Sequence, residues 1–462
     1  MSATRGRLVL VAALFALCTI AAHAPGARGS AGTERNISNL PGPQTNATIT
    51  VDPRNPKILL AGSNSLLEGA ERVYSSTDGG LTWDTTTLTA PVADLASTCP
   101  SDPGVAIDRL GRQYFSFDRS IPCSGEAPSR VYVVSRDGPS AAWSAPVLVA
   151  ALGRARVDDK PAIAVDSSPV SPHRGRVYVV WSRLSRLVVY SVMISHSDDH
   201  GRTWSRPVKV NHAGDDLNYA TLAVARNGTV YVAWTDNLRY SVQIVRSTDG
   251  GLNFSPEVKA AAFIVISIPH CGVGIVVRAD PRTCIQPNPT VTVDTSGRQF
   301  SGRVYVSYTG TDYSGDKGAA LSTFDSRLQP LAGFPLLGYH RIVTRAVGAR
   351  KSDQFWAQSA VDQSSGAVWL CFYDTAGDPA FTKVHYSCGV SRDGGRRWTR
   401  PVRAATAPSD ETQPGARQYG YYQGLAVANG VAHPIWTDAR DVQTLGEEIY
   451  TTRLTRADFA RR

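Results

Sequence analysis

Carboxylates, arginines and tyrosines recur along this chain at the two ends of short apolar segments, where they could combine to bind a sugar or a cation. Glycans require planar hydrogen-bonding groups beside aromatic faces, and arginine can grip a carboxylate with two parallel hydrogen bonds. The chain repeats a pair of short apolar segments. The polar residues that end the second segment of each pair are Asn64, Asp118, Arg119, Arg183, Asp236, Asn237, Asp312, Asp374, Asp438 and Arg440. Those that lead into the first apolar segment are Gln44, Asp102, Asp158, Asp159, Lys160, Tyr219, Gln286, Asn288, Asp353, Trp356, Tyr419, Tyr421, Tyr422 and Gln423.

The collective arrangement of these residues is more informative than any single one. Each acid taken alone can cap a loop or line a water-filled channel, and the recurrence of Trp-Thr-Asp at 234–236 and 436–438 shows that one acid position belongs to the repeat itself. Together, the polar groups of all repeats predict one shared polar pocket, on the axis around which the repeats are arranged, for an extracellular glycan or glycoconjugate. A calcium ion at Asp158 and Asp159 is an alternative, although their order matches no known calcium-binding loop; no other cofactor is expected.

The elements that would position these side chains are short strands. An apolar segment, a short turn and a second β-branched or aromatic segment occur seven times, with equivalent positions at residues 52, 108, 166, 225, 294, 362 and 428. The spacing of 56 to 69 residues leaves room for four strands and their loops in each repeat. Regular four-stranded antiparallel units close into a β-propeller that has few free edges. The sequence therefore predicts an all-β propeller, with seven blades or, if one repeat lies outside the ring, six.

A second motif follows the strand pair in four of the repeats and has the form Ser-x-Asp-x-Gly-x-x-aromatic. Its aspartates are Asp78, Asp199, Asp249 and Asp393, and its aromatic residues are Trp83, Trp204, Phe254 and Trp398. An aspartate of this kind hydrogen-bonds the backbone of its own turn, and glycine supplies the positive φ that a tight turn needs. Because the same acid recurs in turn after turn, we interpret these aspartates as structural rather than catalytic.

This motif is the Asp-box, or bacterial neuraminidase repeat, and with it the chain resembles the sialidase-like superfamily of β-propellers. The segments 159–166 (DKPAIAVD) and 420–424 (GYYQG) are similar to stretches of secreted bacterial exo-α-sialidase-like proteins. The resemblance implies the fold over nearly the whole mature chain. It does not imply the reaction, because one fold can carry enzymes, sugar-binding proteins and scaffolds.

A retaining sialidase of this superfamily uses a tyrosine nucleophile activated by a glutamate, an aspartate acid/base and three arginines that clamp the substrate carboxylate. The resemblance implies candidates for these parts. The catalytic candidates are Tyr421 or Tyr422 as the phenol, Glu411 as its neighbour in the sequence, and Asp102 or Asp159 as the acid. The substrate-binding candidates are Arg183, Arg417 and Arg440 as the clamp, with Asp236, Asp374 and Asp438.

Two features depart from the sialidase pattern. The Phe-Arg-Ile-Pro motif that supplies one clamp arginine is missing, since residues 46–52 read NATITVD. Seven repeats also exceed the six blades of true sialidases. The functional hypothesis is therefore a glycoside hydrolase of exo-α-sialidase type or a glycan-binding propeller. The alternative is a non-catalytic scaffold that binds a protein or polymer at the cell surface.

The first 31 residues have the composition of a secretory signal peptide. Arg5 and Arg7 precede an apolar stretch at 8–22 that is too short to span a bilayer, and small residues follow it. The mature chain is expected to start near residue 25 or 32, and the expected mature protein is a secreted, extracellular and monomeric propeller of residues 32–462 without a transmembrane anchor.

Six cysteines remain once Cys18 is removed with the signal peptide. Export favours disulfides, and proximity in the sequence predicts the pairs Cys99–Cys123, Cys271–Cys284 and Cys371–Cys388. A zinc site is the alternative, but the sequence lacks closely spaced cysteine pairs and a histidine cluster. The formal net charge of +9 comes from scattered arginines rather than from a basic run with interleaved aromatics, so a nucleic acid is not expected as a partner.

Overall fold

The chain folds, in this computed structural model, almost entirely as β-strands. The structure describes residues 33–88, 99–120, 128–151, 157–186, 189–214, 216–264, 274–283, 285–311, 317–331 and 352–459. The predicted leader at 1–31 lies outside these ranges. Cys123 of the predicted pair Cys99–Cys123 and both residues of the predicted pair Cys271–Cys284 lie outside them as well. No helix in the described ranges is long and apolar enough to cross a membrane.

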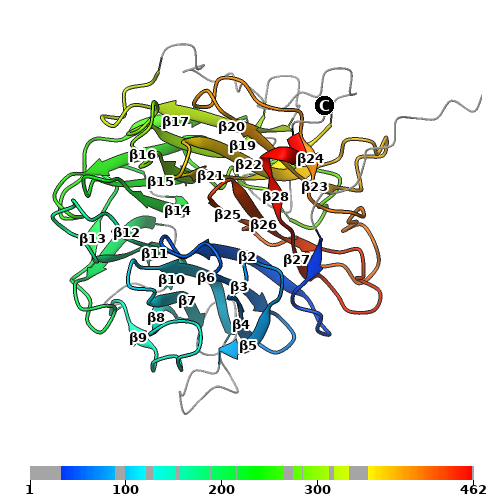
Figure 1. Ribbon diagram of the computed structural model, residues 1–462, viewed down its shortest axis with the longest axis horizontal. Coiled ribbons are helices and arrows are strands. Elements are labelled where there is room, and N and C mark those ends of the chain that lie inside the picture. Colours follow the sequence, from blue (N-terminus) through cyan, green and yellow to red (C-terminus); the bar gives the residue numbers. More distant parts are fainter. Residues whose placement is uncertain are drawn as a thin grey trace, which may run out of the picture.

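Successive strands pair in antiparallel meanders, which we number units 1 to 7 along the chain (Figure 1). Unit 1 contains β2 (Gln44–Val51), β3 (Leu59–Ser65), β4 (Ala70–Ser76) and β5 (Asp84–Leu88). Unit 2 contains β6 (Cys99–Ile107), β7 (Gln113–Ser120), β8 (Ser129–Arg136) and β9 (Val147–Leu148). Unit 3 contains β10 (Val157–Val165), β11 (Val177–Arg186), β12 (Val189–Ser197) and β13 (Val208–Lys209). Unit 4 contains β14 (Leu217–Val224), β15 (Val230–Asp236), β16 (Ser241–Ser247) and β17 (Val258–Ala262).

The last three units complete the series. Unit 5 contains β18 (Thr290–Val293), β19 (Val304–Thr311) and β20 (Lys317–Phe324). Unit 6 contains β21 (Gln354–Asp362), β22 (Ala367–Asp374), β23 (His385–Ser391) and β24 (Val402–Arg403). Unit 7 contains β25 (Gly424–Ala428), β26 (Val431–Asp438), β27 (Glu448–Thr451) and β28 (Leu454–Thr455), followed by the 3-10 turn η2 (Arg456–Phe459). The N-terminal strand β1 (Arg35–Asn36) pairs with β27 and so joins the two ends of the described chain.

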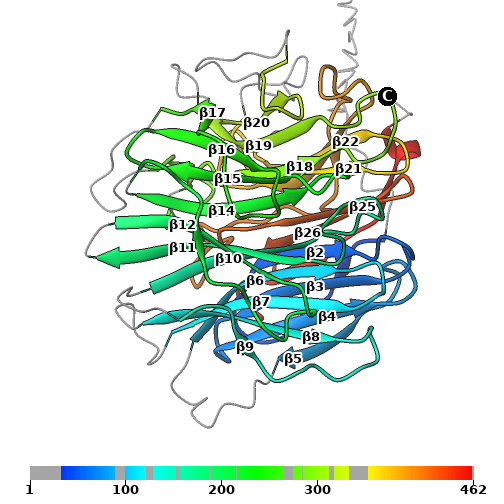
Figure 2. The ribbon, with the colours of Figure 1, turned by 90° about the vertical axis from the view of Figure 1, so that its left-hand side faces the viewer.

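The units follow one another around an axis, as expected for a β-propeller. The first strand of each unit contacts the first strand of the next, from β2 through β6, β10, β14, β18, β21 and β25 and back to β2. These strands face the middle of the disc in Figure 1, and the side view in Figure 2 shows neighbouring units lying face to face. Units 2 and 3 share one eight-stranded sheet through a parallel pairing of Ser129 with Val157, so the strands form six sheets. The all-β propeller is confirmed, whereas the blade number of seven stays a prediction.

The apolar core lies between adjacent units, because both faces of each sheet are covered by neighbours. One buried cluster joins Tyr178 and Val180 of β11 with Leu222 and Trp234 of unit 4. Close packing also fixes one backbone position: a Cβ atom at Gly62 would lie 2.5 Å from the ring of Phe115 in the next unit. Strands that are apolar on both faces explain why the sequence shows continuous apolar runs as well as alternation.

The Asp-box aspartates hold turns in the structure. Ser76 Oγ donates to Asp78 Oδ1 at 2.9 Å, and the backbone N–H groups of Leu81 and Thr82 donate to the same oxygen, each at 2.9 Å. The hydrogen bonds from Thr82 lower the pKa of Asp78 to about 2. Corresponding N–H bonds reach Asp199 from Thr203, Asp249 from Asn253 and Asp393 from Arg397. With their oxygens used in this way, the four aspartates act as local turn caps.

A disulfide links Cys371 of β22 to Cys388 of β23, the pair expected from the sequence. The two residues are directly opposite in register, are fully buried and lie 17 residues apart. Closing a loop of this length restricts the unfolded chain and contributes about 3 kcal/mol to the free energy of unfolding. We expect the double variant Cys371→Ala/Cys388→Ala to lose that amount in urea unfolding. The reduced wild type serves as the control and should unfold at the same urea concentration as the variant, and an unchanged midpoint in the double variant would contradict the expectation.

Candidate functional site

The first strands of the units carry a recurrent irregularity near the axis. Their pairing with the second strand shifts register at 45–48, 101–104, 159–162, 218–221 and 355–358, as at a β-bulge. The left-handed residues at these bulges are Asn46 (φ 58°), Asp102 (58°), Lys160 (55°), Tyr219 (56°) and Trp356 (52°), and Asn288 (41°) precedes β18 in the same way. Positive φ is costly for residues with a side chain and concentrates at functional sites. The bulges therefore indicate that the candidate functional site lies at the axis.

The bulge residues contact one another across unit boundaries. Asn46 Nδ2 donates to Asp102 Oδ1 at 2.7 Å, and Asn46 Oδ1 accepts the backbone N–H of Tyr421 at 2.6 Å. Lys160 Nζ lies 5.3 Å from the ring centre of Tyr219 and 5.5 Å from that of Tyr421, within cation–π range. The rings of Tyr219 and Tyr421 are themselves 5.9 Å apart. Units 1, 2, 3, 4 and 7 thus meet in one group of side chains.

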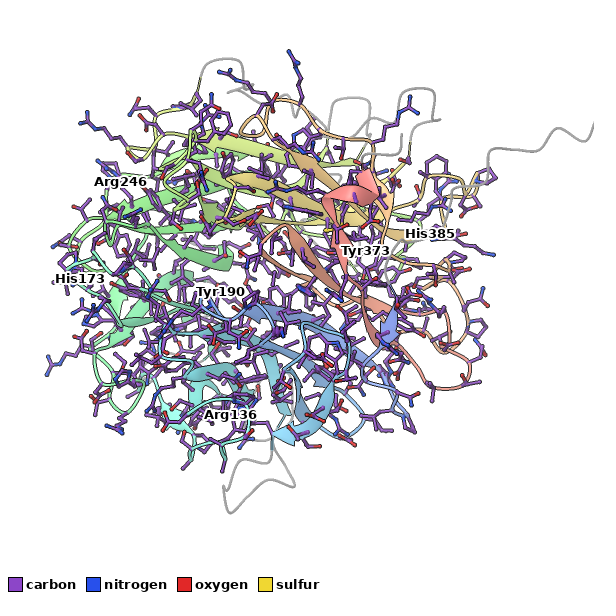
Figure 3. All side chains as sticks on the ribbon, viewed as in Figure 1. Arg136, His173, Tyr190, Arg246, Tyr373 and His385 are labelled. Carbon is purple, nitrogen blue, oxygen red and sulfur yellow. A yellow bond between two sulfur atoms is a disulfide. The ribbon has the colours of Figure 1, made fainter. Side chains whose placement is uncertain are left out.

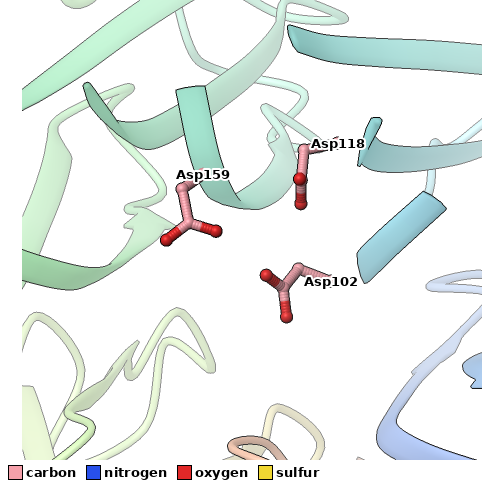
Figure 4. Close-up of side chains that lie close together, drawn as sticks. All are labelled: Asp102, Asp118 and Asp159. Atoms are coloured by element: carbon pink, nitrogen blue, oxygen red, sulfur yellow. The ribbon is translucent and has the colours of Figure 1, made fainter. Parts of the chain in front are cut away.

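Three aspartates form an acid cluster at this place (Figure 4). Asp102, Asp118 and Asp159 each bring one carboxylate oxygen within 4.8 Å of the others. Lys160 Nζ donates to Asp159 Oδ2 at 2.5 Å, and the two side chains form an ion pair. Asp118 accepts hydrogen bonds from Ser129 Oγ at 2.7 Å and from Ser101 Oγ at 3.1 Å.

The acids of the cluster differ in their electrostatic surroundings. Burial raises the pKa of Asp102 to about 7; Lys160 opposes the shift and Asp159 adds to it. Burial, followed by the charges of Asp102 and Asp159, raises the pKa of Asp118 well above its usual value. Although burial works against it, the charges of Asp159 and Asp102 hold the pKa of Lys160 well above its usual value. At neutral pH the site therefore contains a charged lysine, an acid that is partly protonated and a carboxylate paired with the lysine.

Two more titratable groups surround the acid cluster. Glu71 is buried, and burial followed by the charge of Asp102 raises its pKa well above the usual range. Burial, followed by the charge of Asp159, raises the pKa of Tyr190. Figure 3 shows Tyr190 nearer the middle of the disc than Arg136 or His173, which lie toward its rim. Burial near the axis thus raises the pKa values of side chains from several strands.

An axial cavity of about 150 Å³ adjoins the bulges. Its walls include the bulge residues Lys160, Tyr219 and Asn288, together with Tyr422 and Gln423. The remaining lining residues are small or apolar and come mostly from the first strands: Ala47, Thr48, Pro103, Gly104, Val105, Pro161, Ala162, Ile163, Ala220, Thr221, Pro289, Thr290 and Gln358. Because all seven units contribute, the cavity lies on the propeller axis, with the polar bulge residues on one side of it.

The structure brings the predicted catalytic residues Asp102, Asp159, Tyr421 and Tyr422 to this site. Tyr422 lines the cavity, and the ring of Tyr421 lies 6.4 Å from Trp356, edge to face. Burial raises the pKa of both phenols, so they are neutral at physiological pH. Glu411 is buried beside Tyr419 instead: its charge is the main influence on the Tyr419 phenol after burial. The tyrosine–glutamate pair implied by the family resemblance is thus not among the contacts of Tyr421 and Tyr422 in the described structure.

The predicted clamp arginines have other partners. Arg183 Nε and Nη2 donate to the two oxygens of Asp158, each at 2.6 Å. Arg440 donates to Asp438 Oδ1 at 3.0 Å and Oδ2 at 2.7 Å, and to both oxygens of Glu34, each at 2.8 Å. The side chain of Arg417 is exposed. Arg183 therefore holds unit 3 together and Arg440 ties the N-terminal segment to unit 7, while their roles toward a substrate stay predictions.

The predicted substrate-binding acids make local hydrogen bonds. Asp236 Oδ1 accepts the backbone N–H of Arg239 at 3.0 Å, and Asp374 Oδ1 accepts that of Ala376 at 2.9 Å. Asp438 Oδ2 accepts the indole N–H of Trp436 at 2.9 Å in addition to its bonds with Arg440. Asp158 and Asp159, the candidate calcium ligands, already pair with cations of the protein: Asp158 pairs with Arg183 and Asp159 pairs with Lys160.

Comparison with known proteins places the fold. No protein-family model matches the sequence. Among curated proteins, the chain is 26% identical over 239 residues to a xyloglucanase of Hypocrea jecorina (strain QM6a), a match of 47% of this chain and 26% of that protein. It is also 26% identical over 243 residues to a sialidase of Micromonospora viridifaciens, covering 46% of this chain and 34% of that protein. The matched region thus spans about a third or less of each curated relative.

Solved structures extend the similarity to most of the described fold. The Hadza microbial sialidase Hz136 superposes with a TM-score of 0.51 at 12% identity, covering 90% of this chain and 66% of that one. A sialidase of Trypanosoma rangeli gives 0.50 at 11% identity, covering 94% of this chain and 60% of that one. The chain has the fold of a sialidase-type β-propeller. Because these structures are only 12% and 11% identical to the chain, the similarity establishes the fold and not the activity.

Several residues of the axial site in this sialidase-like propeller are not singled out as catalytic or substrate-binding by the sequence. Asp118 completes the acid cluster, Lys160 supplies its cation, and Asn46 links Asp102 to Tyr421. One sequence signal could have found three of the bulges: a polar or aromatic residue followed by proline occurs at Asp102, Lys160 and Asn288. These left-handed positions hold no glycine, so the glycine pattern that marks tight turns in a sequence does not reveal the bulges.

Proposed function

We propose that this sialidase-like propeller binds a neutral extracellular glycan at its axis and hydrolyses it by acid–base catalysis. One observation carries the proposal: Asp102 and Asp159 approach within 4.8 Å at the axis but have opposite surroundings. Asp102 is buried and has a pKa raised to about 7, whereas Asp159 receives a hydrogen bond from the Lys160 ammonium group. Pairs of acids whose environments differ in this way divide into a proton donor and a charged carboxylate.

The two aspartates then take complementary roles. Asp102 protonates the glycosidic oxygen of the leaving group, and its proton is replaced when it later accepts one from the attacking water. Asp159 acts on the opposite side of the sugar ring as the nucleophile, forming a glycosyl–carboxylate bond that water subsequently cleaves. The nearest oxygens of the two carboxylates lie within 4.8 Å of each other, a short separation that favours the retaining over the inverting arrangement. The rings of Tyr219 and Tyr421 provide apolar faces for the sugar.

Charge at the axis argues for a neutral substrate rather than a sialoside. Lys160, the cation of the acid cluster, already pairs with Asp159, so a substrate carboxylate would have to compete with Asp159 for it. Two of the predicted clamp arginines, Arg183 and Arg440, are held by aspartates and Glu34. The partial similarity to a protein named as a xyloglucanase is consistent with a neutral glycan.

The pH dependence of hydrolysis follows from the proton that Asp102 must carry. Because its pKa is raised to about 7, the acid is protonated below that pH and ionised above it. We expect kcat/KM to fall about tenfold per pH unit above roughly pH 7 as the fraction of protonated Asp102 decreases. The measurement is kcat/KM from pH 5 to 9 on an aryl glycoside whose own ionisation lies outside this range. A rate that rises through pH 7 would contradict the assignment of Asp102 as the acid.

A panel of fluorogenic aryl glycosides tests the proposed function. The purified mature chain is assayed on neutral glucosides, galactosides and xylosides, on amino-sugar glycosides and on a sialoside, with and without a chelator. We expect release from at least one neutral glycoside and none from the sialoside. Release from the sialoside alone would contradict the proposal and favour a sialidase.

A non-catalytic propeller that binds a polymer at the cell surface is the second candidate. The burial of the acids favours it, because Asp102 is 5% and Asp118 is 2% exposed. Silence across the glycoside panel, combined with binding of an intact polysaccharide, would support this candidate over the hydrolase.

A further inference from the structure

A second cavity lies away from the axis, at the turns between the first and second strands of units 1 and 2. Its volume is about 500 Å³, a size at which small-molecule sites are common. Unit 1 contributes Asp52, Arg54, Asn55 and Ile58, unit 2 contributes Arg109–Arg112 and Asp137–Pro139, and unit 3 contributes His200. Because the axial acids sit at the beginning of the first strands and these turns follow their ends, the two sites occupy opposite ends of the strands. We call this second cavity the arginine cleft.

The arginine cleft carries an excess of positive charge. Three arginines line it, and of its two acids Asp137 pairs with Arg112 at 2.5 Å. The other acid, Asp52, is buried and caps its own turn by accepting the backbone N–H groups of Arg54 at 2.8 Å and Asn55 at 3.1 Å. Across the described part of the chain, neither Arg54 nor Arg109 forms an ion pair.

A hydrogen bond joins the two turns that carry these arginines. Arg54 Nη1 donates to the backbone carbonyl of Arg109 at 3.1 Å, which bridges the turns of units 1 and 2. The remaining N–H groups of both guanidinium groups are left for a ligand, and their planar fork matches a carboxylate or a sulfate. Leu110, with 78% of its surface exposed, and Pro139 add apolar surface to the same cleft.

We propose that the arginine cleft binds an acidic sugar unit of a polysaccharide through its oxyanion group. The oxyanion is a carboxylate of a uronic acid or a sulfate ester, held by Arg54 and Arg109. The apolar face of the sugar ring rests on Leu110. This site is independent of the axial chemistry, which disfavours a negative charge, so the propeller holds acidic and neutral parts of a glycan at different places.

Titration with defined oligosaccharides tests the proposal. The probes are a labelled tetragalacturonide, a labelled heparin-type tetrasaccharide and a neutral cellotetraose, and binding is followed by fluorescence anisotropy at 0.15 M salt. The test variant is Arg54→Ala/Arg109→Ala, which replaces exposed side chains and should leave the fold intact. The matched control is Arg327→Ala/Arg396→Ala, which removes the same charge from exposed positions in units 5 and 6.

We expect at least one acidic probe to bind the wild type, and the test variant to bind it at least tenfold more weakly. The control variant should stay within a factor of two of the wild type, and cellotetraose should show no dependence on the two arginines. The tetragalacturonide and the heparin-type probe distinguish a carboxylate ligand from a sulfate ligand.

Three outcomes would overturn the proposal. They are no binding of either acidic probe, equal losses in the test and control variants, and equally tight binding of a single-stranded DNA of the same charge. The variant Asp102→Asn should bind the acidic probe as the wild type does, so a failure of the axial hydrolase would be distinguishable from a failure of the cleft.

Discussion

Replacing Asp102 with asparagine is expected to lower glycan hydrolysis by about a hundredfold to ten-thousandfold, the range that general acid catalysis contributes. Asparagine keeps the shape of the side chain, and its carbonyl oxygen can still accept the 2.7 Å hydrogen bond from Asn46 Nδ2. What is lost is the proton that Asp102 holds near neutral pH. The measurement is kcat/KM on the glycoside that the wild type cleaves best.

The control for this variant is Asp84→Asn, at an exposed position in β5 away from the axis. It changes the same functional group and should leave kcat/KM unchanged. A leaving group of low pKa should partly rescue Asp102→Asn, because it needs less protonation. Full activity of Asp102→Asn on an unactivated glycoside would remove Asp102 from the mechanism.

Replacing Lys160 with methionine is expected to lower the free energy of unfolding by about 3–5 kcal/mol at pH 7, the usual cost of leaving buried charges without their partner. Lys160 supplies the cation to the acid cluster, and its side chain is only 13% exposed. Methionine preserves most of the length and apolar contact of the lysine stem. Urea unfolding followed by tryptophan fluorescence gives the change in free energy.

The pH dependence of this loss has a definite sign. In the wild type the folded-state pKa values of Asp102 and Asp118 already lie above their unfolded values, so the folded state binds more protons and ionisation of these acids destabilises it. Without Lys160 this effect grows, because no cation offsets the ionised acids. The destabilisation should therefore shrink as the pH falls from 7 toward 5.

The control is Lys209→Met, at an exposed position in β13, which should change the free energy of unfolding by less than about 0.5 kcal/mol. A Lys160→Met variant that is as stable as the wild type at pH 7 would show that the acid cluster is neutral when folded. That result would also remove the argument that Asp159 is charged.

The sequence predicts the architecture well because repetition amplifies local signals. Glycine and aspartate at fixed offsets define the Asp-box turns, and Asp78 caps its turn as this chemistry requires. The cross-strand pair Cys371–Cys388 follows from the same repeat register. By contrast, the pairing of β1 with β27 joins Arg35 to Thr451, and no local pattern indicates contacts across that distance in the chain.

The candidate site is only partly predictable, because the partner of each charged group depends on loop geometry. The sequence predicts that Arg183 and Arg440 belong to a substrate clamp. In the folded chain Arg183 pairs with Asp158, and Arg440 pairs with Asp438 and Glu34. Many carboxylates lie within reach of any arginine in a repeat protein, so side-chain type alone does not choose among them. The convergence of Asp102 and Asp159 was expected from their positions before the first strands, but Lys160 as their cation depends on the bulge geometry.

The location of a bound sugar tests the central claim most directly. Crystals of Asp102→Asn, which should bind substrate without cleaving it, are soaked with a neutral oligosaccharide that the wild type hydrolyses. We predict a sugar ring at the axis, with its anomeric carbon beside Asp159 and its apolar face against Tyr219 or Tyr421. A sugar found only in the arginine cleft or on the rim, with the axis empty, would contradict the account.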